Sequence, residues 1–269
     1  MTLMAILAGT LLAGIGSVWL AAALSFGLLA RFTQHMLSLA AGALLATAFM
    51  HLLPEAFESR AVGADRLFLV LLGGLVFFFL LDKAELWHHG HEHHHDAPPG
   101  HDGHHGHGHP HPHAHGAKLG GGSWAVLTGD SVHAFGDGVL IASAFMADLH
   151  LGAVASLAVL AHEVPHHMGD LMVLRQLSSN RRVALLKVSL AGAVTALGGV
   201  LGYWLVDLLH GWLTYFLVVA SSSFIYVALA DLIPQLQKRL GARQTLTQIV
   251  WLLAGIGGVS LVSKLAHSG

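Results

Sequence analysis

Five side chains that could bind a metal ion lie within nine positions of one apolar stretch. The segment 162–170 reads His-Glu-Val-Pro-His-His-Met-Gly-Asp, inside an apolar run that extends from about residue 151 to 174. Such side chains are unfavourable in hydrocarbon, so they should face an ion, water or the protein interior. Residues four apart lie on one face of a helix. The spacing predicts two neighbouring stripes, one with His162 and His166 and the other with Glu163, His167 and Asp170.

Pro165 lies in the middle of this stretch. Proline has no N–H, so it frees the carbonyl of Ala161 one turn earlier in a helix. Freed backbone oxygen at membrane depth is tolerated where it lines a cavity. That carbonyl could add a metal ligand or hold water.

A second polar segment, 130–138, lies within the apolar run from about residue 124 to 147. His133 and Asp137 are four apart in it, and Asp130 lies on the adjoining stripe. Facing the two segments toward each other gives three imidazoles and one carboxylate, which suit a borderline-soft divalent ion such as Zn²⁺. The predicted first site is His133, Asp137, His162 and His166.

The remaining polar side chains have several interpretations. Glu163, His167 and Asp170 could form a second, weaker metal site, a proton relay, or hydrogen-bond partners that orient the first-site imidazoles. Asp130 could extend their stripe toward the cytosol. The simplest alternative for both stripes is a set of polar groups that bond helices together.

The two segments resemble signatures of a known family. HAFGDG at 133–138 and HEVPHHMGD at 162–170 are similar to the fourth- and fifth-helix motifs, HNFxDG and HExPHExGD, of the ZIP (Zrt-, Irt-like protein) metal transporters. The resemblance covers nearly the whole chain. It implies uptake of Zn²⁺, and of Fe²⁺, Mn²⁺ or Cd²⁺, into the cytosol, without enzymatic activity. Two residues depart from the motifs, Ala134 and His167, so the resemblance implies either a one-metal centre or a second site rebuilt around Glu163 and His167.

Composition predicts an all-α membrane protein. Only 10% of the 269 residues are charged and 54% are hydrophobic, whereas soluble domains carry roughly 25% charged residues. The net charge of −2 argues against a nucleic-acid partner. The absence of cysteine excludes disulfides and thiolate sites. The first apolar run is too long for a cleaved signal peptide, so a first spanning helix is expected there.

Eight apolar stretches are predicted to be transmembrane helices. They are residues 3–30, 36–57, 67–82, 124–147, 151–174, 185–207, 211–236 and 246–265. The chain then divides into helices one to three (1–83), a histidine-rich loop (84–123), a central metal-binding pair (124–175) and helices six to eight (176–269).

Charge and internal similarity predict how these helices are arranged. Ten Lys and Arg residues fall in the connections on one side and three on the other, which places both termini outside and the histidine-rich loop in the cytosol. An offset of 180 residues aligns 48–55 with 228–235, including Pro54 with Pro234. The aligned helices run in opposite directions. This favours an inverted repeat of helices one to three and six to eight around helices four and five, a 3+2+3 arrangement.

The loop after the third helix contains fourteen histidines, with glycine and proline and few acids. Such a segment cannot build an apolar core, so we expect it to be disordered and to bind metal ions in shifting arrangements. The histidines are His88, His89, His91, His93, His94, His95, His101, His104, His105, His107, His109, His111, His113 and His115.

Other polar residues lie near predicted helix ends. His51 and Glu55 are expected to line an outer entrance, and Asp231 lies near a cytosolic exit. Asp148 and His150, in the short outer connection, could attract cations. We also expect contact with membrane lipid and a homodimer. The short chain favours a bacterial inner membrane.

Two other classes of function remain open. Residues 162–166 form an H-E-x-x-H string, which in an intramembrane protease would hold Zn²⁺ with Glu163 as general base. The proline and the facing His133 and Asp137 argue against it, because catalytic zinc keeps an open position. The other class is a metal-sensing or sequestering membrane protein whose active part is the histidine-rich loop.

Overall fold

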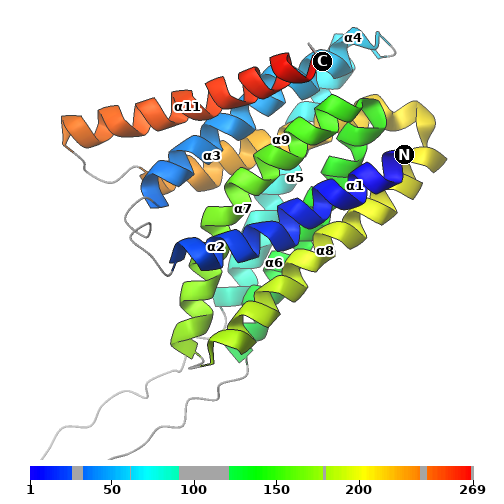
Figure 1. Ribbon diagram of the computed structural model, residues 1–269. Coiled ribbons are helices and arrows are strands. Elements are labelled where there is room, and N and C mark those ends of the chain that lie inside the picture. Colours follow the sequence, from blue (N-terminus) through cyan, green and yellow to red (C-terminus); the bar gives the residue numbers. More distant parts are fainter. Residues whose placement is uncertain (26–32, 61, 91–120, 178–179, 237–240, 268–269) are drawn as a thin grey trace, which may run out of the picture.

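The computed structural model describes residues 1–25, 33–60, 62–90, 121–177, 180–236 and 241–267. Within these ranges the chain is helical and contains no strand (Figure 1). The predicted all-α class is confirmed.

Eight long helical segments follow one another in the described ranges. The first comprises α1 (Thr2–Leu11), the π-helical turn η1 (Leu12–Gly16) and α2 (Ser17–Ser25). The second comprises α3 (Thr33–Thr47), the π turn η3 (Ala48–Leu52) and α4 (Leu53–Glu58). Then come α5 (Ala64–Gly90), α6 (Gly121–Ala147), α7 (Leu149–Leu177) and α8 (Arg181–Leu208). The last two are η4 (His210–Trp212) with α9 (Leu213–Tyr226), the π turn η5 (Val227–Leu232) and α10 (Ile233–Leu236), and finally α11 (Ala242–His267).

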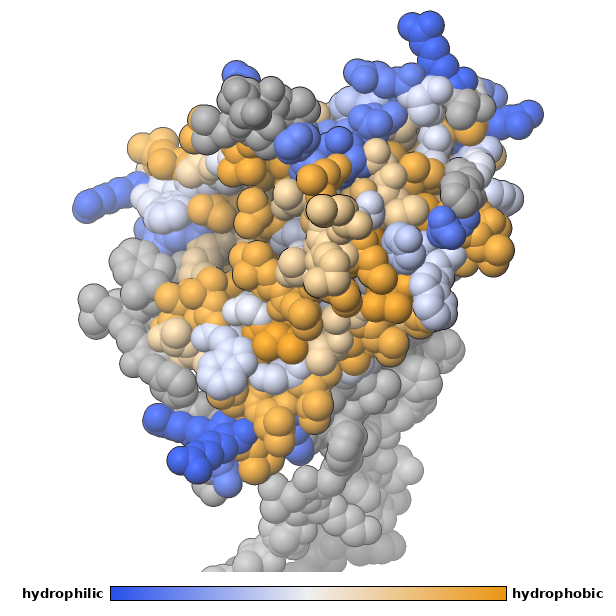
Figure 2. Space-filling view, turned by 45° about the vertical axis from the view of Figure 1, so that its right-hand side comes forward, coloured by the Kyte–Doolittle hydropathy of each residue, from blue (hydrophilic) through white to orange (hydrophobic). Residues whose placement is uncertain are grey.

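Six of these segments are long and apolar enough to cross a membrane, which makes this an integral membrane protein. They are Thr2–Leu24, Thr33–Glu58, Ala64–Leu81, Arg181–Leu208, Leu213–Ala230 and Ala242–Lys264. The other two, α6 and α7, are 27 and 29 residues long but carry the two polar segments. Figure 2 shows apolar side chains over the middle of the molecule and polar ones toward its two ends.

The helices pack in a consistent set of pairs. α6 lies along α8 and against α7, α3 lies along α11, and α5 lies along α9, while α1 contacts α8 (Figure 1). Buried aliphatic and aromatic side chains, among them Leu44, Ile141, Val159 and Phe224, form the core between them. The two polar segments of α6 and α7 therefore face the bundle interior.

Two of the π turns lie next to a proline. Pro54 and Pro234 each follow such a turn, η3 and η5. A proline ring clashes with the carbonyl one turn earlier and offers it no N–H, and a π turn widens the helix there. The two turns also lie at positions related by the 180-residue offset.

Glycines let α6 and α8 approach closely at defined positions. A Cβ added at Gly138 would run into the backbone of Thr195, Gly198 and Gly199, whereas one added at Gly136 would meet nothing within 4 Å. The two glycines lie in the same helix, so they form a matched pair for a test of this contact.

We expect Gly138→Ala to destabilise the bundle by about 1–3 kcal/mol, because backbone on both sides cannot yield to the added methyl group. Gly136→Ala should be neutral or slightly stabilising, since alanine favours a helix over glycine by up to about 1 kcal/mol. Thermal unfolding of the two variants in detergent measures the difference. Equal unfolding temperatures would contradict the close contact.

Candidate metal centre

Side chains of α6 and α7 form two adjacent groups of candidate metal ligands. The first group is His133, Asp137, His162 and Glu163, and the second group is Asp130, His166, His167 and Asp170. Within each group, one ligand atom from every residue lies within 4.8 Å of the others. Each group offers two imidazoles and two carboxylates, a set that suits a borderline-soft divalent cation.

The first group is centred on His162 Nε2. This atom lies 3.3 Å from Asp137 Oδ2, 3.1 Å from Glu163 Oε1 and 3.4 Å from His133 Nε2. Asp137, His162 and Glu163 are almost fully buried, whereas the side chain of His133 is 30% exposed. His133 is therefore the member through which an ion could reach this group.

A backbone contact fixes the orientation of the His162 ring. Its Nδ1 lies 3.4 Å from the carbonyl oxygen of Ala158, one turn earlier in α7. A carbonyl only accepts, so in this contact Nδ1–H is the donor and Nε2 is left with a free lone pair. That lone pair faces two carboxylate oxygens and a second imidazole, and a cation between them would satisfy all four atoms.

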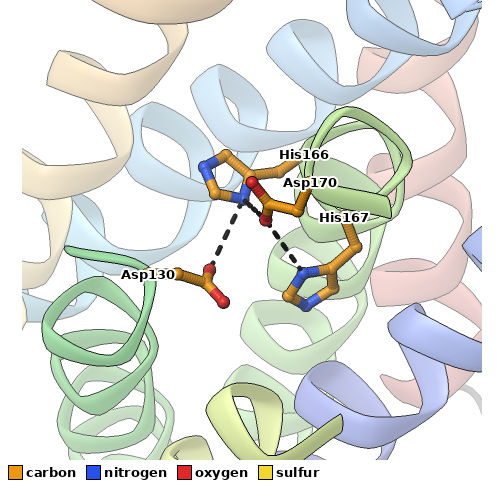
Figure 3. Close-up of side chains that lie close together, drawn as sticks. All are labelled: Asp130, His166, His167 and Asp170. Atoms are coloured by element: carbon orange, nitrogen blue, oxygen red, sulfur yellow. Dashed lines mark ion pairs between the residues drawn. The ribbon is translucent and has the colours of Figure 1, made fainter. Parts of the chain in front are cut away.

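The second group, drawn in Figure 3, lies about one helical turn further along α7. His166 Nδ1 lies 3.3 Å from Asp170 Oδ2 and 3.6 Å from Asp130 Oδ1, and His167 Nδ1 lies 3.6 Å from the same Asp170 oxygen. His167 is fully buried, and the side chain of His166 is 37% exposed. The His133 and His166 rings stack, with centroids 5.8 Å apart. The exposed member of each group thus lies beside the exposed member of the other.

Glu163 joins the two groups. Its Oε1 faces His162 and His133, while its Oε2 lies 3.0 Å from His167 Nε2. Glu163 is a candidate ligand of the first group and contacts a histidine of the second. The two groups are therefore adjacent and linked through this carboxylate.

The buried polar atoms of this centre are not satisfied by the protein. Among the described residues, Asp137 Oδ2, both carboxylate oxygens of Glu163 and of Asp130, and both ring nitrogens of His167 are buried and make no hydrogen bond. A buried polar group without a hydrogen bond is strongly unfavourable. These atoms converge at distances a bound cation could span. The ligand set therefore fits divalent cations.

The division into groups differs from the one expected from the helix stripes: Glu163 replaces His166 in the first group. The physical reason is height along the helix. Residues 162 and 163 differ by about 1.5 Å along the axis, whereas 162 and 166 differ by about 6 Å. Because α6 and α7 are antiparallel neighbours, His133 and Asp137 lie level with 162–163, and Asp130 lies level with 166–170.

The two departures from the family motifs are both buried. Ala134 is 1% exposed and supplies no ligand, and His167 takes part in the second group. That group uses Asp130 and Asp170 beside the two histidines. From the sequence, Asp130 was expected to extend this stripe toward the cytosol.

The predicted entrance residues lie around a pocket of about 180 Å³ at the N-terminal end of α7. His51 and Glu55 line it together with Glu58, Asp148 and His150. Glu58 had not been predicted there. Asp148 also caps α7, since its Oδ1 accepts hydrogen bonds from the backbone N–H groups of His150 and Leu151.

Other predicted residues fall outside what the structure describes. The histidines from His91 to His115 lie in residues 91–120, which are not described. His88 and His89 belong to the end of α5, which continues past the predicted end of that helix at residue 82, but their side chains are not described. The side chain of Asp231, in η5, is likewise outside the described set.

Fold and centre together define a class: helical membrane proteins with a buried cluster of metal-ligand side chains between two of their helices. A family model described as ZIP zinc transporter matches residues 1–263. The chain belongs to the ZIP zinc transporter family. This family consists of transporters and not of enzymes, so the protease interpretation is not retained.

Several curated proteins are similar to the chain. Zinc transporter ZIP4 of Rattus norvegicus is 29% identical over 281 residues, which cover 87% of this chain and 43% of that protein. Zinc transporter foi of Drosophila melanogaster is 34% identical over 52% of this chain and 20% of its own length. Zinc transporter ZIP13 of Danio rerio is 28% identical over 86% of this chain and 76% of that protein. The chain thus spans less than half the length of ZIP4 and foi.

Proposed function

We propose that this protein moves divalent cations, above all Zn²⁺, across the membrane into the cytosol through the two ligand groups between α6 and α7. The observation that carries the proposal is the set of buried, unsatisfied carboxylate and imidazole atoms that converge inside an apolar bundle. Names of the similar proteins point to the same substrate. The test is radioactive zinc uptake into vesicles that contain the purified protein, compared with a first-group variant as set out in the Discussion.

The ligand chemistry favours some cations over others. Two imidazoles and two carboxylates in each group suit Zn²⁺, Fe²⁺ and Cd²⁺ and are less suited to Mg²⁺ or Ca²⁺, which prefer oxygen alone. Mn²⁺ binds such sites more weakly than Fe²⁺ or Zn²⁺. We therefore infer that Zn²⁺ is the main substrate and that Fe²⁺, Cd²⁺ and Mn²⁺ compete with it.

We infer that all eight helical segments cross the membrane in an inverted 3+2+3 repeat. In such a repeat helices one, two and three correspond to six, seven and eight, and four corresponds to five. The contacting pair α3 and α11 then corresponds to the contacting pair α9 and α5. Likewise, the pair α6 and α8 corresponds to the pair α7 and α2. The π turns before Pro54 and Pro234 are also related in this way. The termini are proposed to lie outside and residues 91–120 in the cytosol, from the distribution of Lys and Arg.

We infer that two groups of helices move against each other during transport. Glycine contacts tie α8 to α6 at Gly138 and to η1 at Gly14, while others tie α3 to α11 at Gly42 and α5 to α9 at Gly74. The contacts at Gly14, Gly42 and Gly138 are with backbone, and that at Gly74 is with the side chain of Ser222. Such close approach joins helices firmly. The metal-bearing α6 and α7 therefore move with α1, η1, α2 and α8, and the remaining helices form the frame. These frame helices would supply the contacts with a second copy of the chain in a homodimer and with the surrounding lipid.

The outer pocket lined by His51, Glu55 and Glu58 is proposed to be the entrance for the cation. Glu55→Gln combined with Glu58→Gln should raise the KM for zinc uptake by about threefold and leave kcat unchanged, since these exposed carboxylates raise the local cation concentration. The effect should shrink at high salt. Asp65→Asn, which removes an exposed carboxylate that does not line this pocket, is the matched control. An unchanged KM in the double variant would contradict an entrance here.

Uptake should also depend on external pH, because an imidazole binds metal only when it is neutral. Below about pH 6.5, the ordinary pKa of histidine, apparent zinc affinity should fall by up to about tenfold per pH unit for each imidazole that must lose a proton. Above that pH the affinity should level off. Initial rates measured between about pH 5 and 7.5 test this, and a flat profile would count against coordination by histidine.

A further inference from the structure

A second cavity lies between α3, α7 and α11, outside the metal centre. Its volume is about 180 Å³. Every residue that lines it is aliphatic or glycine, including Ala43 of α3, Leu157 and Ala161 of α7, and Gly258 and Val262 of α11. We call it the α3–α7–α11 groove.

Small residues on α11 explain why the groove exists. A Cβ added at Gly255 would run into the backbone carbonyl of Leu39, so α11 touches α3 at this position. One turn further on, a Cβ at Gly258 would meet nothing within 4 Å. On the facing helix, Ala161 leaves space where a larger side chain would fill it. Helices α3 and α11 are therefore in contact at the level of Gly255 and stand apart at the level of Gly258.

The groove continues into the apolar outer surface of the bundle. Two of its lining residues, Leu157 and Val262, are 40% and 37% exposed. In an integral membrane protein this surface borders hydrocarbon. Water would find no hydrogen-bond partner among aliphatic side chains, and an apolar cavity of about 150 Å³ stays dry and takes up apolar ligands the size of benzene.

We propose that the α3–α7–α11 groove binds a segment of an acyl chain from a membrane phospholipid. An empty groove would leave its lining without dispersion contacts on one side, and a chain of methylenes restores them. Lipid tails are as apolar as the lining, so the preference over the open surface comes from packing contacts and not from transfer out of water. Ala161 directly precedes His162, so the bound chain touches α7 at the height of the metal centre.

The test uses the full-length protein in phosphatidylcholine vesicles that include a phosphatidylcholine with a diazirine in the middle of one acyl chain. After irradiation, mass spectrometry measures the label on the α7 peptide that contains Leu157 and Ala161. Gly258→Leu fills the groove from the opposite helix and leaves this peptide unchanged in sequence. Gly257→Leu is the matched control, since Gly257 is exposed, does not line the groove and has open space around it.

We expect Gly258→Leu to lower the label on the α7 peptide by about fivefold, because the added side chain takes the place of the acyl chain. Gly257→Leu should leave it as in the wild type, and label on the lipid-facing side of α5 should be equal in all proteins. If Gly258→Leu fails to fold, Ala254→Leu fills the same groove from another lining position. Equal α7 label in the wild type and in folded groove-filling variants would overturn the proposal. That result would leave the proposed transport activity untouched.

Discussion

Replacing His162 by alanine should reduce zinc uptake at least about 100-fold, to the level of vesicles without protein. Its Nε2 lies at the centre of the first group, within 3.4 Å of Asp137, Glu163 and His133. Residues that merely orient a metal ligand already cost 10- to 100-fold in affinity or activity when they are lost, and a direct ligand should cost more. The alanine variant also leaves two buried carboxylates facing each other without a partner between them.

Uptake of radioactive zinc into vesicles that contain equal amounts of folded protein measures this effect. Asp137→Ala should give the same loss. Ser156→Ala is the matched control on the same helix, since the buried Ser156 hydroxyl donates to the carbonyl of Gly152 and Ser156 belongs to neither ligand group. Wild-type uptake by a folded His162→Ala protein would refute the assignment of the first group.

Replacing Glu163 by glutamine should weaken cation binding in both groups at once. Its Oε1 is a candidate ligand atom of the first group and its Oε2 contacts His167 of the second, so the loss of its negative charge removes a charged ligand from one group and the carboxylate partner of a ligand from the other. In a variant without residues 88–115, which removes the loop histidines from the count, we expect two zinc ions per molecule. His166→Ala should leave one, and Glu163→Gln should leave fewer than one at the same free zinc concentration.

Equilibrium dialysis followed by elemental analysis gives these numbers. Glu58→Gln, which changes an exposed glutamate of α4 in the same way, is the control and should retain both ions. Loss of only one ion in Glu163→Gln would mean that the two groups do not share this carboxylate. Uptake by the loop-deleted protein itself separates transport from sequestration, because a sequestering protein would lose its activity with the loop.

Sequence alone was sufficient to find the two polar segments and the all-helical class. Both follow from local properties: which residue types occur and how apolar their neighbours are. The structure groups Glu163, in place of His166, with His133, Asp137 and His162. The helix stripes do not predict this, because the angular position on a helix says nothing of the rise along its axis. Because α6 and α7 are antiparallel, Glu163 lies level with His133 and Asp137, and Asp130 lies level with residues 166–170.

Other features depend on tertiary packing and could not be predicted. Gly136 and Gly138 look alike in the sequence, yet only Gly138 lies against a neighbouring backbone. Similarly, Pro54 and Pro234 follow π turns, whereas α7 continues as an α-helix through Pro165. The local effect of a proline is known in advance, but how the helix accommodates it depends on its neighbours. The α3–α7–α11 groove likewise exists only because three distant segments meet.

Val154 forms part of the wall of both the outer polar pocket and the apolar groove. At that depth a single isopropyl group divides a space suited to hydrated ions from one suited to hydrocarbon. A β-branched side chain in a helix has one strongly preferred rotamer, which makes Val154 a fixed partition. The polar pocket and the apolar groove therefore have this side chain as a common wall.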